Sequence, residues 1–306
     1  MKRFIGVLPV FITLLPVAGC TGNEVNTYKL YYLGGQSNMD GFGYVNELPE
    51  GMTVQFSDIY IFHGNTSPDN TLPDGKGLWA NMRTGHGTGF TSDGITNNYS
   101  NRFGVEITFA ARMKELDPGS GVALLKYSRS GTSIDQEAAR GSGSWDPDYS
   151  EGNGINQYDH FLASVEIALG VEDIDGDGKR DKLIPSGILW MQGESDGDVS
   201  EEIALRYYEN LTQLMGLIRK ALGSEDIPIV IGRISDSGDN QSGVVWEWAN
   251  IVREAQMKYA EADPNAGIVT TTDNYGYSDP WHYDSEGYID LGKQFAIVLD
   301  SLNRQE

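Results

Sequence analysis

The sequence has 306 residues, of which 39% are hydrophobic, and it carries a formal net charge of −22 at pH 7. A surface so rich in acidic groups repels the phosphate backbone, which argues against nucleic acid as a partner. The length suits one large α/β domain or two small ones, and the single cysteine excludes an intrachain disulfide.

The first 19 residues have the pattern of an export signal. Two basic residues precede an apolar stretch from Phe4 to Leu15, which is too short to span a bilayer stably. Val17 to Cys20 resembles the bacterial lipoprotein box, in which the cysteine becomes the lipidated first residue. We expect an exported lipoprotein of the cell envelope, periplasmic or at the cell surface, that touches the membrane only through a lipid on Cys20. Ordinary signal cleavage beside an incidental cysteine is the alternative.

The rest of the chain alternates strands and helices. Nearly continuous apolar runs predict buried strands at 29–33, 122–127, 184–190, 227–234 and 267–272. Apolar residues spaced by three and four predict helices at 104–116, 201–222, 244–262 and 286–303. This alternation predicts a three-layer α/β/α fold with a parallel sheet of about five strands. Without a linker to divide it, residues 20–306 are expected to form one domain.

Two stretches depart from this alternation. Residues 41–102 are rich in Gly, Asn, Thr and aromatics and predict a long loop excursion with one strand at 54–62. Residues 141–154 are a second irregular segment. Long loops above the carboxyl edge of a sheet commonly shape substrate pockets, although plain surface packing explains such residues equally well.

Four short segments contain the residues expected to do chemistry. The first is Gly34 to Met39, directly after an apolar strand, and it places Ser37 on a tight glycine turn. Such a turn presents its serine at the carboxyl edge of the sheet, where α/β folds bind their ligands. Taken alone it is weak support for a nucleophile, because Gly-Gly-x-Ser turns also end strands that have no catalytic role.

The second and third segments also follow strands. Lys126 to Ile134 ends in a small-residue turn whose backbone N–H groups could stabilise an oxyanion. Trp190 to Asp196 places an amide and two carboxylates at the end of the most apolar strand. A buried amide can donate to an oxyanion and a carboxylate can orient a base, whereas a capped loop start is the simpler explanation.

The fourth segment supplies the base. The chain has four histidines, and His282 alone follows the last strand by a short loop. Histidine is the usual general base for a serine, and Asp279 is close enough to hydrogen bond to its other ring nitrogen. Half of a metal site would look the same, but no cluster of ligand residues accompanies it.

Together the four segments resemble the SGNH-hydrolase superfamily, specifically the carbohydrate acetylesterase branch of sialate O-acetylesterases and carbohydrate esterase family 6 acetylxylan esterases. That branch has Gly-Gln-Ser-Asn-Met, Gly-Gly-Thr-Ser, Trp-x-Gln-Gly-Glu-x-Asp and Asp-x-x-His motifs. They are matched, in order, at Gly35 to Met39, Ser130 to Ser133, Trp190 to Asp196 and Asp279 to His282. The resemblance implies a flavodoxin-like sheet.

The resemblance also implies a serine esterase that removes O-acetyl groups and needs no cofactor for catalysis. Ser37 attacks the acetyl carbonyl, and His282 takes its proton. Asp279 is favoured as the acid that orients His282 because of its spacing, and Glu194 is the alternative. The other expected site residues are Ser37, Ser130 or Gly131 and Gln192 as oxyanion donors, and Gln36, Asn38 and Arg129 as substrate contacts.

The expected partner is an acetylated carbohydrate, with a neutral polysaccharide or its oligosaccharides favoured. A sialate O-acetylesterase, or another acyl-ester hydrolase of the superfamily, is the first alternative. Sialic acid would require basic partners such as Arg83, Arg102 or Arg129. A non-catalytic glycan-binding surface lipoprotein is the alternative of another class.

A separate motif lies between the second and third segments. Asp173, Asp175, Asp177 and Asp181 alternate around glycines as in the first nine positions of an EF-hand loop. The twelfth position is Ile184, where an EF-hand has a bidentate Glu. We expect a structural calcium site here, with a solvated acidic turn as the alternative.

Overall fold

The computed structural model describes residue 1 and residues 26–65, 74–150 and 155–304. The expected export signal and Cys20 lie outside these residues. Within the described ranges, none of the helices combines the length and the apolar character needed to cross a membrane.

A sheet forms the centre of the described chain, with seven strands in the order β11-β10-β9-β1-β8-β3-β4. All neighbouring strands run parallel except β3 and β4. The strands are β1 (Asn26–Gly35), β3 (Gln55–His63), β4 (Trp79–Arg83), β8 (Gly121–Ser128), β9 (Asp181–Met191), β10 (Ile229–Gly232) and β11 (Ala266–Val269).

The three-layer parallel arrangement is confirmed, but the expected number of about five strands is too low. The strand expected at 54–62 is β3, and β4 follows it out of the same excursion to form the sheet edge. β4 escaped prediction because it is a short edge strand in which only Trp79 and Met82 are buried, so it forms neither an apolar run nor a regular alternation. Two pairs of two-residue strands belong to the excursion: β2 (Gly43–Tyr44) with β7 (Arg102–Phe103), and β5 (Thr91–Ser92) with β6 (Asn97–Asn98).

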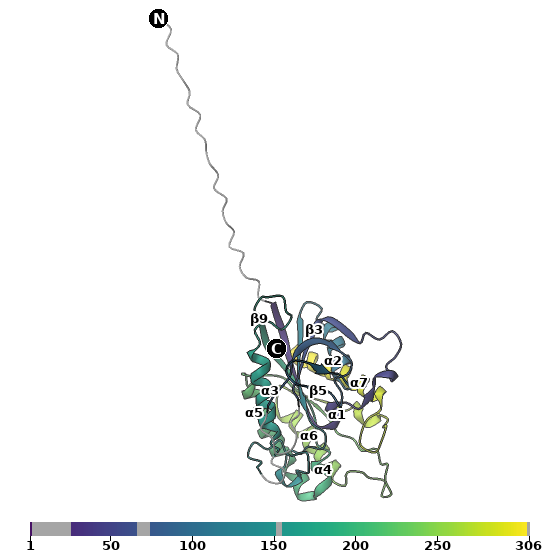
Figure 1. Ribbon diagram of the computed structural model, residues 1–306. Coiled ribbons are helices and arrows are strands. Elements are labelled where there is room, and N and C mark those ends of the chain that lie inside the picture. The colour runs from purple at the N-terminus through teal and green to yellow at the C-terminus, as the bar shows by residue number, and fades with distance from the viewer. Residues whose placement is uncertain (2–25, 66–73, 151–154, 305–306) are drawn as a thin grey trace.

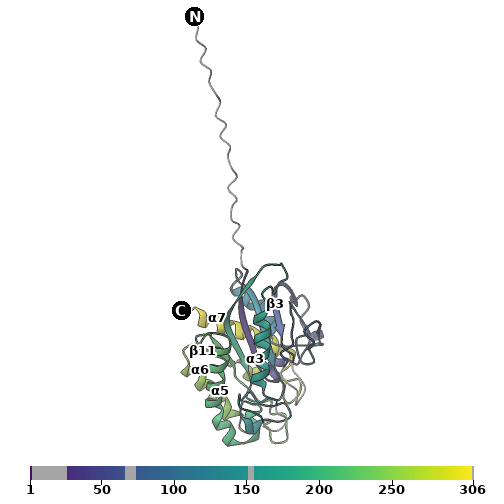
Figure 2. The same ribbon diagram turned by 60° about the vertical axis from the view of Figure 1, so that its left-hand side comes forward.

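Helices cover both faces of the sheet (Figures 1 and 2). One face holds α2 (Glu106–Leu116) and α7 (Ser285–Asn303), and the other holds α3 (Gln157–Gly170), α5 (Glu201–Ala221) and α6 (Ala249–Ala262). The sequence analysis gave no range for α3. The shorter helices are α1 (Ser37–Asp40) and α4 (Asp196–Val199), with 3-10 turns at Val45–Glu47, Gln136–Ala138 and Thr271–Asn274.

The register of the three central strands brings the predicted segments together. β1 enters at the top of Figure 1 and runs downward, so the parallel strands end at the lower edge, near α1 and α4. Gly35 at the end of β1 pairs with Ser128 of β8 on one side and with Met191 of β9 on the other. The first three segments therefore begin side by side at one edge of the sheet.

A buried ion pair fixes this edge to the helix layer. Lys126 Nζ lies 2.8 Å from Glu106 Oε2, and both side chains are fully buried. The same ammonium donates to the carbonyl oxygens of Asp40 and His86, each at 2.8 Å. All three protons of the ammonium are thus used, which the burial of a charge requires.

Lys126→Met should lower the free energy of unfolding by about 3–5 kcal/mol, because it leaves the Glu106 carboxylate buried without a counterion. Urea denaturation measures this loss, and a second change, Glu106→Gln, should recover part of it. Lys114→Met is the control: its pair with Asp58 is solvent-exposed and should be worth less than about 1 kcal/mol. Equal free energies of unfolding for Lys126→Met and Lys114→Met would contradict this account of the Lys126–Glu106 ion pair.

Candidate active site

A glycine turn presents Ser37. Gly35 has a φ of +140°, and a Cβ on it would lie 2.0 Å from the Met191 carbonyl oxygen, so no other residue fits. The next N–H, of Gln36, donates to that same carbonyl at 2.8 Å. The chain then turns sharply into α1, and Ser37 lies at its first position with 6% of its surface exposed.

Asn38 connects this turn to the segment that contains His282. Its Nδ2 donates to the Trp281 carbonyl at 3.2 Å, and its Oδ1 accepts from the Tyr283 N–H at 3.3 Å. These two bonds hold the residues immediately before and after His282. The sequence analysis expected Asn38 to contact substrate, but the amide is 2% exposed and its bonds are made within the protein. Its position assigns it to holding Ser37 and His282 together.

His282 is fixed on both sides. Its Nδ1 lies 2.8 Å from Asp279 Oδ2, while the other carboxylate oxygen accepts the backbone N–H groups of Trp281 and His282. The ring of Phe42 stacks flat on the imidazole, with ring centroids 3.6 Å apart and planes within 3°. With Nδ1 bound to a carboxylate, Nε2 is the nitrogen left for proton transfer.

The two candidate acids for orienting His282, Asp279 and Glu194, differ in their hydrogen-bond partners and in the direction of their pKa shifts. Burial on its own would raise the pKa of Asp279, but hydrogen bonds from His282 and the Trp281 N–H hold that pKa below its usual value. Burial instead raises the pKa of Glu194 from 4.5 to about 7, and its Oε1 accepts from Asn38 at 2.8 Å. Asp279 is thus the ionised group on the imidazole, whereas Glu194 supports Asn38.

The turn after β8 is held by a residue that the sequence analysis did not single out. The two carboxylate oxygens of Asp40, at the end of α1, accept the Ser128 and Ser130 hydroxyls, and the Ser130 N–H also donates to this carboxylate. The Ser130 N–H is therefore engaged. Gly131, the other donor left open by the sequence, follows in the same turn with a φ of +74°.

The sequence analysis expected Gln192 to donate to the oxyanion, and in the structure its amide makes its hydrogen bonds within the protein. It is fully buried, and its Nε2 donates to Asp196 Oδ2 at 2.6 Å and to the Thr132 carbonyl at 3.2 Å. Gln36, which the sequence analysis expected to contact substrate, is 3% exposed, and its Oε1 accepts the N–H groups of Gly193 and Ser195. Both amides hold the turns in register, because unpaired buried amides are costly.

Comparison with known proteins identifies the family of the chain. The sequence model of a family described as "carbohydrate esterase, sialic acid-specific acetylesterase" matches residues 27–300. The chain belongs to this carbohydrate esterase family. It is a carboxylic ester hydrolase that removes O-acetyl groups from carbohydrates, as the four motifs predicted. No curated protein matches the chain in sequence.

Solved structures share the fold of this carbohydrate esterase. A protein from Arabidopsis thaliana is 21% identical, with a TM-score of 0.58 and coverage of 90% of this chain and 98% of that one. A carbohydrate acetylesterase from Xanthomonas citri is 16% identical, with a TM-score of 0.61 and coverage of 91% and 57%. NanS is 14% identical, with a TM-score of 0.57 and coverage of 92% and 99%.

The supporting residues of the site were missed because each acts at long range. Tyr288 OH donates to Asn38 Oδ1 from α7, and Tyr207 OH and Gln256 Nε2 both donate to the Gln192 carbonyl from α5 and α6. The one sequence signal for these residues is a polar side chain at a position of a helix that is otherwise apolar. Tyr207 and Gln256 stand among the buried positions of their helices.

Asp279→Asn should lower kcat by several orders of magnitude, because an amide favours the wrong tautomer of His282. Glu194→Gln should cost less, because glutamine can still accept the Asn38 hydrogen bond. Steady-state kinetics on p-nitrophenyl acetate measure both effects. The reverse order of the two losses would move the orienting role to Glu194.

Proposed function

We propose that this esterase acts through Ser37, His282 and Asp279. The Ser37 hydroxyl attacks the acetyl carbonyl while His282 takes its proton, and the imidazolium then protonates the departing sugar oxygen. Water, activated by the same imidazole, releases acetate from the acyl-enzyme. The N–H groups of Ser37 and Gly131 bind the oxyanion, and losing one such donor typically costs about 2.7–4 kcal/mol of barrier.

One observation supports this proposal above the others. In a chain of a carbohydrate esterase family, an ionised Asp279 and an aromatic-stacked His282 are tied through Asn38 to the serine turn. A non-catalytic glycan binder has no use for such an array. A lipid acyl hydrolase would need a long apolar channel, whereas the cavity beside the turn after β8 has polar walls, with Asp40 and His63 among them.

Ser37→Ala should abolish hydrolysis without unfolding the protein. Acetate release is measured from acetylated xylan, an O-acetylated sialic acid and a long-chain p-nitrophenyl ester. Wild type should release acetate from carbohydrate and leave the long-chain ester nearly untouched. Retention by Ser37→Ala of more than about a thousandth of the wild-type rate would rule out the nucleophile assignment.

Residues 20–306 are proposed to form the mature single-domain lipoprotein. The described chain enters the sheet at Asn26, at the edge opposite the catalytic turn, so a lipid on Cys20 would direct the site away from the membrane. Cys20→Ser should move the protein from the membrane fraction to the soluble fraction of an expressing bacterium. An unchanged distribution would contradict lipidation.

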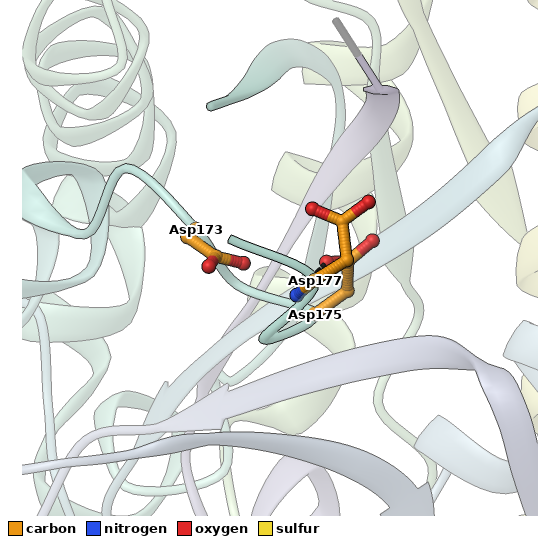
Figure 3. A group of neighbouring side chains, drawn as sticks. All are labelled: Asp173, Asp175 and Asp177. Carbon is orange, nitrogen blue, oxygen red and sulfur yellow. Dashed lines mark hydrogen bonds between the residues drawn. The ribbon is translucent and has the colours of Figure 1, made fainter. Parts of the chain in front are cut away.

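The loop before β9 is proposed to bind calcium in a structural role. Figure 3 shows the carboxylate of Asp173 pointing toward Asp175 and Asp177, and one oxygen from each lies within 4.8 Å of the others. Asp181, which the sequence analysis added as a ligand, is not part of this group of neighbouring carboxylates, and its Oδ2 accepts the Ile174 N–H at 2.7 Å. The loop lies at the amino end of β9, away from the catalytic edge.

Chelation should lower the melting temperature of the wild type, because the crowded carboxylates repel one another without a cation and binding stabilises the fold by mass action. Differential scanning fluorimetry with chelator or millimolar calcium measures the shift. Asp177→Ala should not respond, whereas Asp226→Ala, which removes an exposed acid elsewhere, should respond like wild type. Identical wild-type curves in both conditions would identify the loop as a solvated turn.

A further inference from the structure

A cavity of about 290 Å³ lies directly beside the oxyanion turn. It lies between the ends of β3 and β8 and the loop from Gly87 to Phe90, and Asp40, Arg129 and Ser130 are in its wall. Ser130 directly precedes the proposed oxyanion donor Gly131, and Asp40 ends the helix that begins with Ser37. The cavity wall therefore includes residues close in the chain to Ser37 and Gly131, although neither of these two residues lines it.

Two histidines give one wall of the cavity its hydrogen-bonding character. His63 lies in the wall, and its Nδ1 is 3.4 Å from Nδ1 of His86 behind it. The ring of His63 stacks on Phe90 at 4.1 Å, which fixes its orientation. Burial lowers the pKa of both rings, that of His86 to about 3, and the Lys126 ammonium adds to the shift. His63 therefore acts as a neutral donor or acceptor.

The remaining charges in the wall compensate each other. Among the described residues that line the cavity, Arg129 is the one permanent cation and Asp40 the one carboxylate. The nearby Lys126 ammonium is neutralised by Glu106 at 2.8 Å. The rest of the wall consists of hydroxyls, backbone and the edge of Phe90. Such a wall has no excess positive charge to attract the carboxylate of a ligand. It does offer many hydrogen-bond donors and acceptors for the hydroxyl groups of a ligand.

We propose that this cavity holds the sugar ring on the alcohol side of the ester and that it selects a neutral, hydroxyl-rich ring, with His63 as a specificity-determining residue. The inference rests on the proposed function, since it names the substrate class of that same site. A site built to hydrogen bond hydroxyl groups discriminates against ligands that leave its buried polar groups unpaired. The volume, near the lower end for small-molecule sites, suits a single ring.

The test compares kcat/KM on three esters: an acetylated methyl xyloside, an O-acetylated sialic acid and p-nitrophenyl acetate, which has no sugar. Wild type should prefer the xyloside to the sialic acid. His63→Gln should lower the ratio of kcat/KM on the xyloside to kcat/KM on p-nitrophenyl acetate about five- to tenfold. The change should arise mainly from a higher KM for the xyloside, as expected for one lost hydrogen bond. His160→Gln is the matched control, because His160 is a buried histidine of α3 that is not among the residues lining the cavity. This variant should keep the wild-type ratio of the two kcat/KM values.

A second variant covers the case in which His63→Gln fails to fold. Thr88→Trp fills the cavity from its half-buried rim and should lower the same ratio at least as far, while Ile95→Trp, on an exposed loop, should not. Unchanged ratios in His63→Gln and Thr88→Trp, or an altered preference between acetyl and butyryl esters instead, would overturn the inference. So would a preference for the sialic acid. Wild type inactive on all three acetates would instead contradict the proposed function.

Discussion

The side-chain amide of Asn38 is the interaction on which the catalytic geometry depends. It joins α1, the turn after β9, the loop around His282 and helix α7 through hydrogen bonds to Glu194, Trp281, Tyr283 and Tyr288. At 2% exposure these bonds cannot be exchanged for bonds to water without cost. Three regions distant in sequence, namely α1, the turn after β9 and the His282 loop with the α7 that follows it, are therefore held in one arrangement by one short side chain.

The sheet makes this arrangement possible, and buried charge makes it specific. β1, β8 and β9 end in register, so the turns that follow them start from fixed points. Asp40 and Asp196 then accept hydrogen bonds from the turn after β8, and burial raises the pKa of each, that of Asp196 to about 6. Burying acids in this way reduces stability, which is the usual cost of a precisely oriented site.

Much of this could be predicted from the sequence, because strand runs and turn motifs are local. Ser37, Asp279 and His282 stand at the ends of such runs, and the spacing of Asp279 and His282 alone brought them into contact. The directions of Gln36 and Gln192 could not be predicted, since whether an amide faces substrate or protein depends on which buried groups compete for it. The Gln192 amide donates to the Asp196 carboxylate and the Thr132 carbonyl, and the contact with Thr132 exists only in the folded chain.

The same limit explains the elements that were missed. β4 is an edge strand that pairs antiparallel with β3, and its residues lie outside the apolar runs of the sequence. Asp40 looks like an ordinary helix-end acid in the sequence, yet its carboxylate accepts the Ser128 and Ser130 hydroxyls and so holds the turn that contains both candidate oxyanion donors, Ser130 and Gly131. Choices between neighbouring backbone donors depend on single contacts of this kind, and composition or periodicity does not encode them.

The most direct measurement of the central claim is the rate at which a fluorophosphonate labels Ser37 in Asn38→Ala, followed by mass spectrometry on protein shown to be folded. If Asn38 holds His282 against the serine turn, labelling should slow at least about a hundredfold relative to wild type, as expected for a small displacement of catalytic groups. Labelling of folded Asn38→Ala at the wild-type rate would show that Ser37 and His282 meet without Asn38 and would contradict the account.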